Sequence, residues 1–373
     1  MQIAFTSPMK PLDSTVPSGD RSMGRLLMDA LQRSGHEVEI ATKFRSWSAE
    51  GGDSHFDALA HSSGLEAHRI ATEWTERGYR PDLMVTYHLY HKAPDWIGPA
   101  LAKRFNCPYM VVEASRAPKQ EQGAWRMGFE AADAAMKQAD MVLALHHADA
   151  QCLSDILPED HLALLPPFLD TDRFVRIPPS KEPQEKGHSV RLLCVAMMRE
   201  GAKTRSYMLL ADALRQLESH NWTLSIVGGG ANDHDIHHAF DGLPTTFYGA
   251  VRHRDMPQIY HDHEVLVWPA IRESFGITIM EAQASGLPVV SSDSLGIPDI
   301  VEHGQTGLLS PENDMEGFKK NLTTLLKDPD KRRKMGKKAR ARMENRHSMV
   351  AGAALLQQHI DHALTNFQRK EKP

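Results

Sequence analysis

Cysteine is scarce in this chain: its 373 residues include only Cys107, Cys152 and Cys194, which lie far apart. Their odd number and wide spacing argue against a disulfide framework and against a clustered thiolate metal site. Long apolar runs are missing as well, since no stretch approaches about eighteen consecutive apolar residues. Polar residues and proline follow the first apolar residues too soon for a secretory signal. We therefore expect a cytoplasmic protein that does not span a membrane.

An excess of positive charge is also absent, because the formal net charge is −5 at pH 7. This overall acidity argues against a general nucleic-acid-binding role. One local exception is the stretch 331–342, which contains eight Lys or Arg residues and no acid. We interpret it as the solvated face of a helix, with peripheral attachment to the inner face of a membrane as the alternative.

Short apolar runs alternate with longer helical patterns along most of the chain, which is typical of parallel sheets with crossover helices. The helical patterns include 22–32, which ends at Gly35, and 96–105. Apolar runs that predict strands lie at 2–6, 37–42, 83–87, 109–113, 141–145 and 162–165, and then at 191–195, 223–227, 246–248, 265–268 and 289–291. Three further helices are predicted after residue 314.

The alternation stops between 166 and 187, where prolines lie among charged residues, and this stretch is predicted to be an interdomain linker. We therefore predict an α/β chain of two Rossmann-like, doubly wound domains, at 1–170 and 171–352. Open α/β sheets bind ligands at the carboxyl ends of their strands. The functional site is accordingly expected in a central cleft that the two domains face.

Glu273 and Glu281 lie eight residues apart around a predicted helix start. Ser274 is the expected N-cap of a helix of about ten residues that ends at Gly286. The backbone amides of 276–278 would then lie at the positive end of the helix dipole, where phosphate binds well. Carboxylates accept hydrogen bonds from vicinal hydroxyls, so one glutamate suits a ribose and the other a hexose. This pattern predicts a sugar-nucleotide site.

The residues around this pair form a specific pattern: Glu-x7-Glu, then Gly-Leu-Pro-Val-Val at 286–290 and Gly-Ile-Pro-Asp-Ile-Val-Glu-His-Gly-Gln-Thr-Gly-Leu-Leu at 296–309. The segment resembles the retaining glycosyltransferases of family 4, and weaker likeness extends to 35–38, 170–174 and 227–230. The resemblance implies a GT-B fold, with an acceptor domain first and a nucleotide-sugar donor domain second. It also implies that a C-terminal helix within 353–373 returns to complete the first domain.

The resemblance further implies roles for the residues around the pair. Glu273 would contact the donor hexose and Glu281 the nucleotide ribose. The diphosphate would be bound by the backbone of the segment between them, whose residues are Ser274, Phe275, Gly276 and Ile277.

Cations are expected to neutralise the diphosphate, and here the sequence departs from the family. Met197 stands where the family usually has arginine, and the cations come later in a loop. We nominate Arg199 and Lys203 for this catalytic role, since Arg199 lies nearest the end of the preceding strand. Arg205 is predicted to adjoin a helix that begins near Ser206.

Three glycines and a histidine complete the predicted site. Gly19 matches one glycine of a pair that closes over the family's reaction centre, and the alternative is a capped helix start. Gly228 and Gly230 are predicted to form a tight turn near the donor. His88 follows the strand at 83–87, where the family places a histidine that faces the cleft, and it is assigned a catalytic role.

A second family histidine, after the strand at 109–113, is replaced by Ala114 and Ser115, so acceptor recognition is expected to differ.

Two other patterns point to different ligands and are discounted. His234, His237 and His238 share the i, i+3, i+4 spacing of a metal site. We expect them to be solvated, with no bound metal and no cofactor other than the donor substrate. The glycines at 228–230 do not fit the spacing of a dinucleotide fingerprint.

The sequence thus predicts a retaining, metal-independent glycosyltransferase that moves a hexosyl group from a nucleoside-diphosphate sugar. The acceptor is left open among saccharides, lipids and small molecules. Two alternatives remain: another GT-B enzyme, such as a sugar-nucleotide epimerase or a phosphorylase, and a non-catalytic sugar-nucleotide-binding protein.

Overall fold

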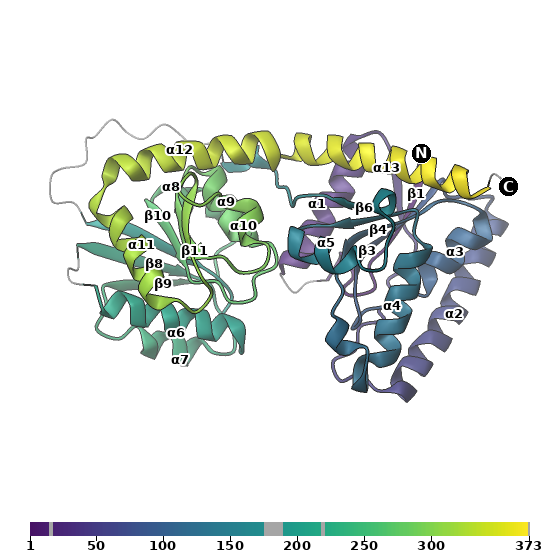
Figure 1. The fold of residues 1–373 in the computed structure, drawn as a ribbon, viewed down its shortest axis with the longest axis horizontal. Coiled ribbons are helices and arrows are strands. Elements are labelled where there is room, and N and C mark those ends of the chain that lie inside the picture. The colour runs from purple at the N-terminus through teal and green to yellow at the C-terminus, as the bar shows by residue number, and fades with distance from the viewer. Residues whose placement is uncertain (15–17, 175–188, 218–220, 372–373) are drawn as a thin grey trace. The chain divides into compact units, whose positions relative to one another are not determined.

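A computed structural model describes residues 1–14, 18–174, 189–217 and 221–371 (Figure 1). Contacts divide the chain into two units, Met1–Phe168 with Met349–Pro373, and Leu169–Ser348. The sequence-based boundaries had assigned 169–170 to the first unit and 349–352 to the second, and the contacts reverse both assignments. Most of the predicted linker, from 175 onward, lies outside the described residues. Before it, Thr171–Phe174 forms a 3-10 helix.

The first unit is built on a six-stranded parallel sheet with the strand order β2-β1-β3-β4-β5-β6. Its central strands are buried on both faces, which explains why they read as unbroken apolar runs. The strands are β1 (Gln2–Thr6), β2 (Glu37–Ile40), β3 (Leu83–Leu89), β4 (Tyr109–Ala114), β5 (Met141–Ala144) and β6 (Leu162–Leu164).

Helices cover this sheet. The first begins at Gly19, three residues earlier than predicted, and Ser18 caps it by accepting a hydrogen bond from the Arg21 amide at 3.2 Å. The second is long and was not predicted, although it buries Phe56 and Trp74. The helices are α1 (Gly19–Arg33), α2 (Asp53–Glu76), α3 (Ile97–Phe105), α4 (Arg126–Gln138), α5 (His147–Leu153) and α13 (Met349–Glu371).

The second unit repeats the architecture, with a parallel sheet of order β12-β11-β10-β7-β8-β9. Its strands are β7 (Val190–Val195), β8 (Trp222–Val227), β9 (Thr245–Gly249), β10 (Val265–Trp268), β11 (Val289–Ser292) and β12 (Gly307–Ser310). Its helices are α6 (Ala202–Arg215), α7 (Asp233–Ala239), α8 (Met256–His261), α9 (Ile277–Ala284), α10 (Ile297–Ile300), α11 (Met315–Lys327) and α12 (Pro329–Arg346). The prediction of two doubly wound α/β domains is confirmed.

The basic stretch 331–342 forms the middle of α12, and two of its arginines are tied into the second unit. Arg332 is only 8% exposed and pairs with Glu264 at 3.3 Å. Arg342 pairs with Glu302 at 3.2 Å. The prediction of a solvated face is therefore wrong for these two residues. Their guanidinium groups form ion pairs with residues of neighbouring elements. Among the described residues, no helix combines the length and the apolar character needed to cross a bilayer.

Helix α13 belongs to the first unit, as the resemblance implied for the C-terminal helix, and it lies beside α1 (Figure 1). It also packs on β5. Leu356, Ile360 and Ala363 are buried on its inner face. At its far end, the Asn366 side-chain amide donates to the backbone oxygens of Asp140 and Asp160, at 3.0 and 2.8 Å. A segment distant in sequence therefore completes the core of the first unit.

We predict that Ile360→Ala lowers the free energy of unfolding of the first unit by about 2–5 kcal/mol, because Ile360 is 1% exposed and its truncation leaves a cavity. Val350, on the same helix and 80% exposed, is the matched control, and Val350→Ala should cost no more than about 0.5 kcal/mol. Hydrogen exchange of β1, β3 and β4 as a function of urea measures both effects. Equal costs for the two variants would contradict this role of α13.

Candidate functional site

Lys203 and Glu273, which the sequence placed in separate segments, meet in the second unit. The Lys203 ammonium donates a hydrogen bond to Glu273 Oε2 and forms an ion pair with it. The Trp268 indole N–H points to the same oxygen at 3.4 Å, and the ammonium lies 5.3 Å from the centre of the Trp268 ring. The two side chains are 28% and 19% exposed, so the pair is shielded yet reachable from solvent.

The register predicted for the cationic loop is wrong in part. Helix α6 begins at Ala202, four residues before the predicted start, so Lys203 and Arg205 are helical rather than in a loop. Gly201, at φ 87°, makes the turn that allows this early start. Arg199 stays in the loop, exposed, with its guanidinium 3.0 Å from the Met197 sulfur.

The glycines after β8 bring that loop against the loop after β7. Gly228 has φ 151°, and a Cβ there would lie 1.8 Å from the Ala196 oxygen. Gly230 has φ 158°, and its Cβ would lie 2.3 Å from the Met198 oxygen. Only glycine permits this approach. The turn at 228–230 therefore lies beside the chain that leads from β7 toward Lys203.

Helix α9 begins later than predicted. Its N-cap is Gly276, in a left-handed conformation at φ 50° and ψ 59°, and Ser274 is exposed outside the helix. The side chain of the N-cap residue therefore cannot satisfy the first amides of the helix, because glycine has none. Phe275 is buried at 7% exposure, and Ile277 is the first helical residue. The prediction of Ser274 as N-cap is wrong because the chain turns at Gly276.

Glu281 lies inside α9 and is 5% exposed. The Tyr260 hydroxyl donates to its Oε2 at 2.7 Å, and His253 Nδ1 lies 3.6 Å from its Oε1. Burial raises the pKa of Glu281 to about 7, although the hydrogen bond from Tyr260 acts in the opposite direction. A carboxyl group of this kind both accepts and donates hydrogen bonds near neutral pH, which suits a diol.

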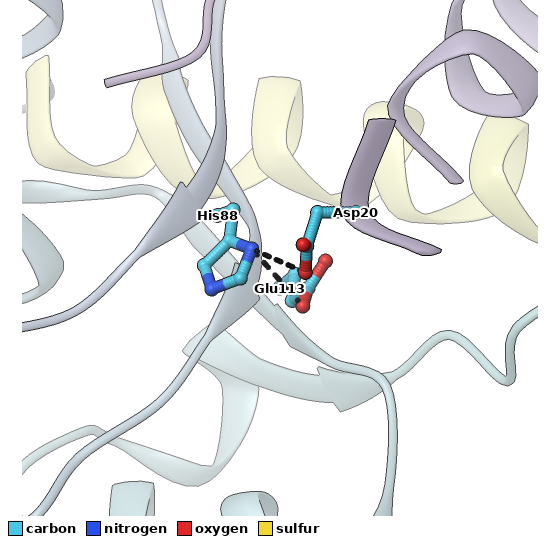
Figure 2. A group of neighbouring side chains, drawn as sticks. All are labelled: Asp20, His88 and Glu113. Atoms are coloured by element: carbon cyan, nitrogen blue, oxygen red, sulfur yellow. Dashed lines mark ion pairs between the residues drawn. The ribbon is translucent and has the colours of Figure 1, made fainter. Parts of the chain in front are cut away.

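His88 lies in the first unit, near the end of β3 rather than beyond it (Figure 2). Its Nδ1 is 3.5 Å from Asp20 Oδ1 and 3.3 Å from Glu113 Oε1. Asp20 comes from the first turn of α1, and Glu113 from β4. Burial raises the pKa of Glu113 to about 7, and the nearby His88 acts in the opposite direction.

The sequence reasoning missed Asp20 and Glu113. It considered only Ala114 and Ser115 after this strand, as the replacement of a second family histidine, whereas β4 continues to Ala114 and Glu113 is the residue beside His88. A charged residue at the end of an otherwise apolar strand was the available signal. The predicted Gly19 is the first residue of α1, directly before Asp20, while 15–17 lie outside the described residues.

The histidines of α7 have acidic neighbours. His237 lies 3.2 Å from Asp233, and its ring stacks on Phe247 with the ring centres 3.7 Å apart. His238 lies 2.7 Å from Asp241, and His234 is 96% exposed. Within the described part of the chain, the one group of three or more side chains placed to ligate a metal is the Asp20, His88 and Glu113 group of the first unit.

Comparisons with known proteins agree with this architecture. Residues 180–342 match the family described as Glycosyl transferases group 1. Sulfoquinovosyl transferase SQD2 from Arabidopsis thaliana is 34% identical over 152 residues, which span 40% of this chain and 30% of that protein. The chain therefore matches about a third of the length of this relative.

Solved structures match nearly the whole chain. Sucrose-phosphate synthase from Thermosynechococcus elongatus has a TM-score of 0.77 at 20% identity, covering 98% of this chain and 99% of that one. HepE from Anabaena, in complex with UDP-glucose, has a TM-score of 0.70 at 18% identity, covering 97% and 99%. The two six-stranded parallel sheets with their helices therefore define a GT-B fold, and the family match covers most of the second unit.

We predict that Glu281 makes stability depend on pH. Its pKa is about 7 in the folded protein against 4.5 for an ordinary glutamate, so the folded state binds more protons than the unfolded state between these values. The free energy of unfolding should therefore fall by up to about 3 kcal/mol as pH rises through this window. Urea unfolding from pH 4 to 8 measures this decrease.

Glu281→Gln should lack the part of this decrease that Glu281 contributes, since an amide does not titrate, while Glu113 of the first unit, whose pKa is also raised to about 7, keeps its own contribution. Glu200→Gln, at an exposed position of the same unit as Glu281, should retain the whole decrease. Parallel pH profiles for the wild type and Glu281→Gln would show that Glu281 titrates normally.

Proposed function

We propose that this protein is a retaining glycosyltransferase that transfers a hexosyl group from a nucleoside-diphosphate sugar to a saccharide, lipid or small-molecule acceptor. The observation that carries the proposal is the meeting of Lys203 with Glu273 just before α9, with the buried Glu281 inside that helix. A cation, two carboxylates and free helix amides are the groups that a sugar nucleotide requires.

The comparisons support the donor class. HepE was solved with UDP-glucose, and the SQD2 relative is named a transferase of a sugar. The family match covers 180–342, which includes Lys203, Glu273 and Glu281. We assign Glu281 to the ribose and Glu273 to the hexose of the donor, as the family resemblance implies.

The chemistry that we assign to these groups is stabilisation of the leaving diphosphate. Negative charge grows on this group as the glycosidic bond breaks, and helix amides alone oppose it with only about half a unit of charge. Lys203 is held by Glu273 in the structure described here. When the donor hexose engages Glu273, the ammonium is placed to turn toward the diphosphate, with Arg199 as the second cation.

The proposed displacement occurs on one face of the sugar, so the anomeric configuration is retained. The departing phosphate accepts the proton of the acceptor, and the protein supplies orientation and charge. We assign His88, in the first unit, to the acceptor side. In this scheme the diphosphate is neutralised by side chains and amides, and donor binding requires no divalent cation.

Incubation with labelled UDP-, GDP- and ADP-hexoses, in the presence of candidate saccharide and lipid acceptors, tests the proposal. We expect transfer with a product whose anomeric configuration matches that of the donor, as read by NMR. Inversion would remove the protein from the retaining class. Isomerisation or phosphorolysis would instead identify another GT-B enzyme, and saturable binding without turnover would identify a sugar-nucleotide-binding protein.

Two glutamate variants separate the roles within the same assay. Glu273→Ala should abolish transfer but leave the affinity for the free nucleoside diphosphate intact, because it removes only the hexose contact and releases Lys203. Glu281→Ala should also lower the affinity for the free nucleoside diphosphate. Calorimetry with the nucleoside diphosphate measures both, and equal losses of affinity would overturn this division of roles.

We predict that Lys203→Ala lowers kcat by about 100-fold or more while changing the KM for the donor much less. The charge that Lys203 opposes develops mainly during bond cleavage, so its loss affects the transition state most. Arg205→Ala is the matched control, because Arg205 lies on the same helix but is exposed, and its kcat should stay near the wild-type value. A wild-type kcat for Lys203→Ala together with a lowered kcat for Arg205→Ala would show that Arg205, and not Lys203, acts on the diphosphate.

A further inference from the structure

The group formed by Asp20, His88 and Glu113 has a geometry that glycosyl transfer at the second unit does not explain (Figure 2). We infer that these three side chains bind one first-row divalent metal ion, with Zn²⁺ as the best fit. The ligand atoms are His88 Nδ1, Asp20 Oδ1 and Glu113 Oε1. This inference concerns the first unit alone and holds whether or not the proposed transfer reaction is correct.

The two distances from His88 Nδ1 to the carboxylate oxygens are those expected between ligands of a tetrahedral ion, and the three ligand atoms lie within 4.8 Å of one another. Zn²⁺ binds imidazole nitrogen at about 2.0–2.1 Å and carboxylate oxygen at about 2.0–2.2 Å. Two such ligands at a tetrahedral angle lie about 3.3–3.5 Å apart. His88 Nδ1 lies 3.3 Å from Glu113 Oε1 and 3.5 Å from Asp20 Oδ1. A direct bond between imidazolium and carboxylate would be shorter, at about 2.7–2.9 Å.

Burial restricts what can occupy this group. Glu113 is 7% exposed, with Oε1 toward His88; among the described residues its Oε2 has no hydrogen bond of standard geometry, although the Tyr87 hydroxyl is near enough to lower the pKa of Glu113. His88 Nδ1 is likewise hidden from solvent without a hydrogen bond. The side chains of His88 and Asp20 are 15% and 28% exposed, so an ion can enter from that side and lie between the three ligand atoms. A buried carboxylate without sufficient partners is costly, and a divalent cation removes that cost.

The ligand types favour zinc among the common ions. An imidazole nitrogen suits Zn²⁺ and disfavours Mg²⁺ and Ca²⁺, which prefer oxygen ligands only. Two carboxylates balance the charge of a divalent ion. Three protein ligands also leave one tetrahedral position for water or for an acceptor group.

The three ligands come from three elements, which gives the ion a structural consequence. Asp20 lies in the first turn of α1, His88 in β3 and Glu113 in β4. Both His88 and Glu113 have φ 61°, an uncommon conformation for residues other than glycine. The ion would hold the start of α1 against the ends of two neighbouring strands.

Metal titration of the full chain tests the inference. The protein is treated with EDTA, dialysed, and titrated with Zn²⁺ by calorimetry and with Co²⁺ by visible absorption. We expect one equivalent of each ion, a Co²⁺ spectrum of tetrahedral intensity, and a higher Tm with bound Zn²⁺. His88→Ala and Glu113→Gln should each weaken binding by at least the 10- to 100-fold that even an outer-shell partner contributes.

The control is the triple variant His234→Ala, His237→Ala and His238→Ala, which removes the exposed histidines of α7 and should keep the full stoichiometry and affinity. Glu113→Gln preserves the size of the side chain, and its circular dichroism reports whether it folds. Binding lost in the triple variant but kept in Glu113→Gln would overturn the inference. The inference would also be overturned if no metal ion bound at one equivalent and NMR showed a protonated His88 imidazole, because a proton would then take the place of the metal ion between the three side chains.

Chelation also separates this inference from the proposed function. EDTA should lower the Tm and leave the affinity for a free nucleoside diphosphate unchanged, because that ligand is assigned to the second unit. Loss of nucleotide affinity on chelation would place a metal at the donor site and contradict the assignment made here.

Discussion

Parallel pairing of the strands is the constraint on which the rest of this structure depends. Parallel neighbours need a crossover connection, so helices lie between successive strands, and the central strands of each sheet are buried on both faces. The carboxyl ends of the strands then lie at one edge of each sheet. The candidate residues occur there: Glu113 near the end of β4, and Lys203 and Glu273 after β7 and β10. The parallel topology therefore brings functional side chains from distant parts of the sequence to the same edge of each sheet.

Within the second unit, charge and burial are balanced differently at the two glutamates. Glu273 is partly exposed and has a cation, Lys203, as its partner. Glu281 is almost fully buried and has a phenol, Tyr260, as its partner, so its pKa rises to about 7. These environments suit different tasks, since one carboxylate accepts a hydrogen bond from an ammonium group and the other can donate or accept a hydrogen bond near neutral pH. The two glutamates belong to one sequence motif, but their environments in the structure differ.

Much of the architecture was accessible from the sequence because its signals are local. Apolar runs of strand length predicted all the strands of both sheets except β12, and Glu-x7-Glu with its flanking residues indicated the GT-B fold. Helix α2 was missed because its buried residues, such as Phe56, Ser63 and Trp74, are too sparse and too mixed in polarity to form an apolar stripe. The starts of α6 and α9 were misplaced because Gly201 and Gly276 set them through backbone turns.

The sequence alone determined the class of the fold, the two-unit organisation and the candidate glutamates, because periodicity, turn residues and motif spacing act over a few residues. Only the tertiary structure decided that Lys203 meets Glu273, that burial raises the pKa of Glu281, and that Asp20 and Glu113 join His88. These facts depend on distances between residues far apart in the chain. Such distances are fixed by strand order and crossover packing, which no local pattern encodes.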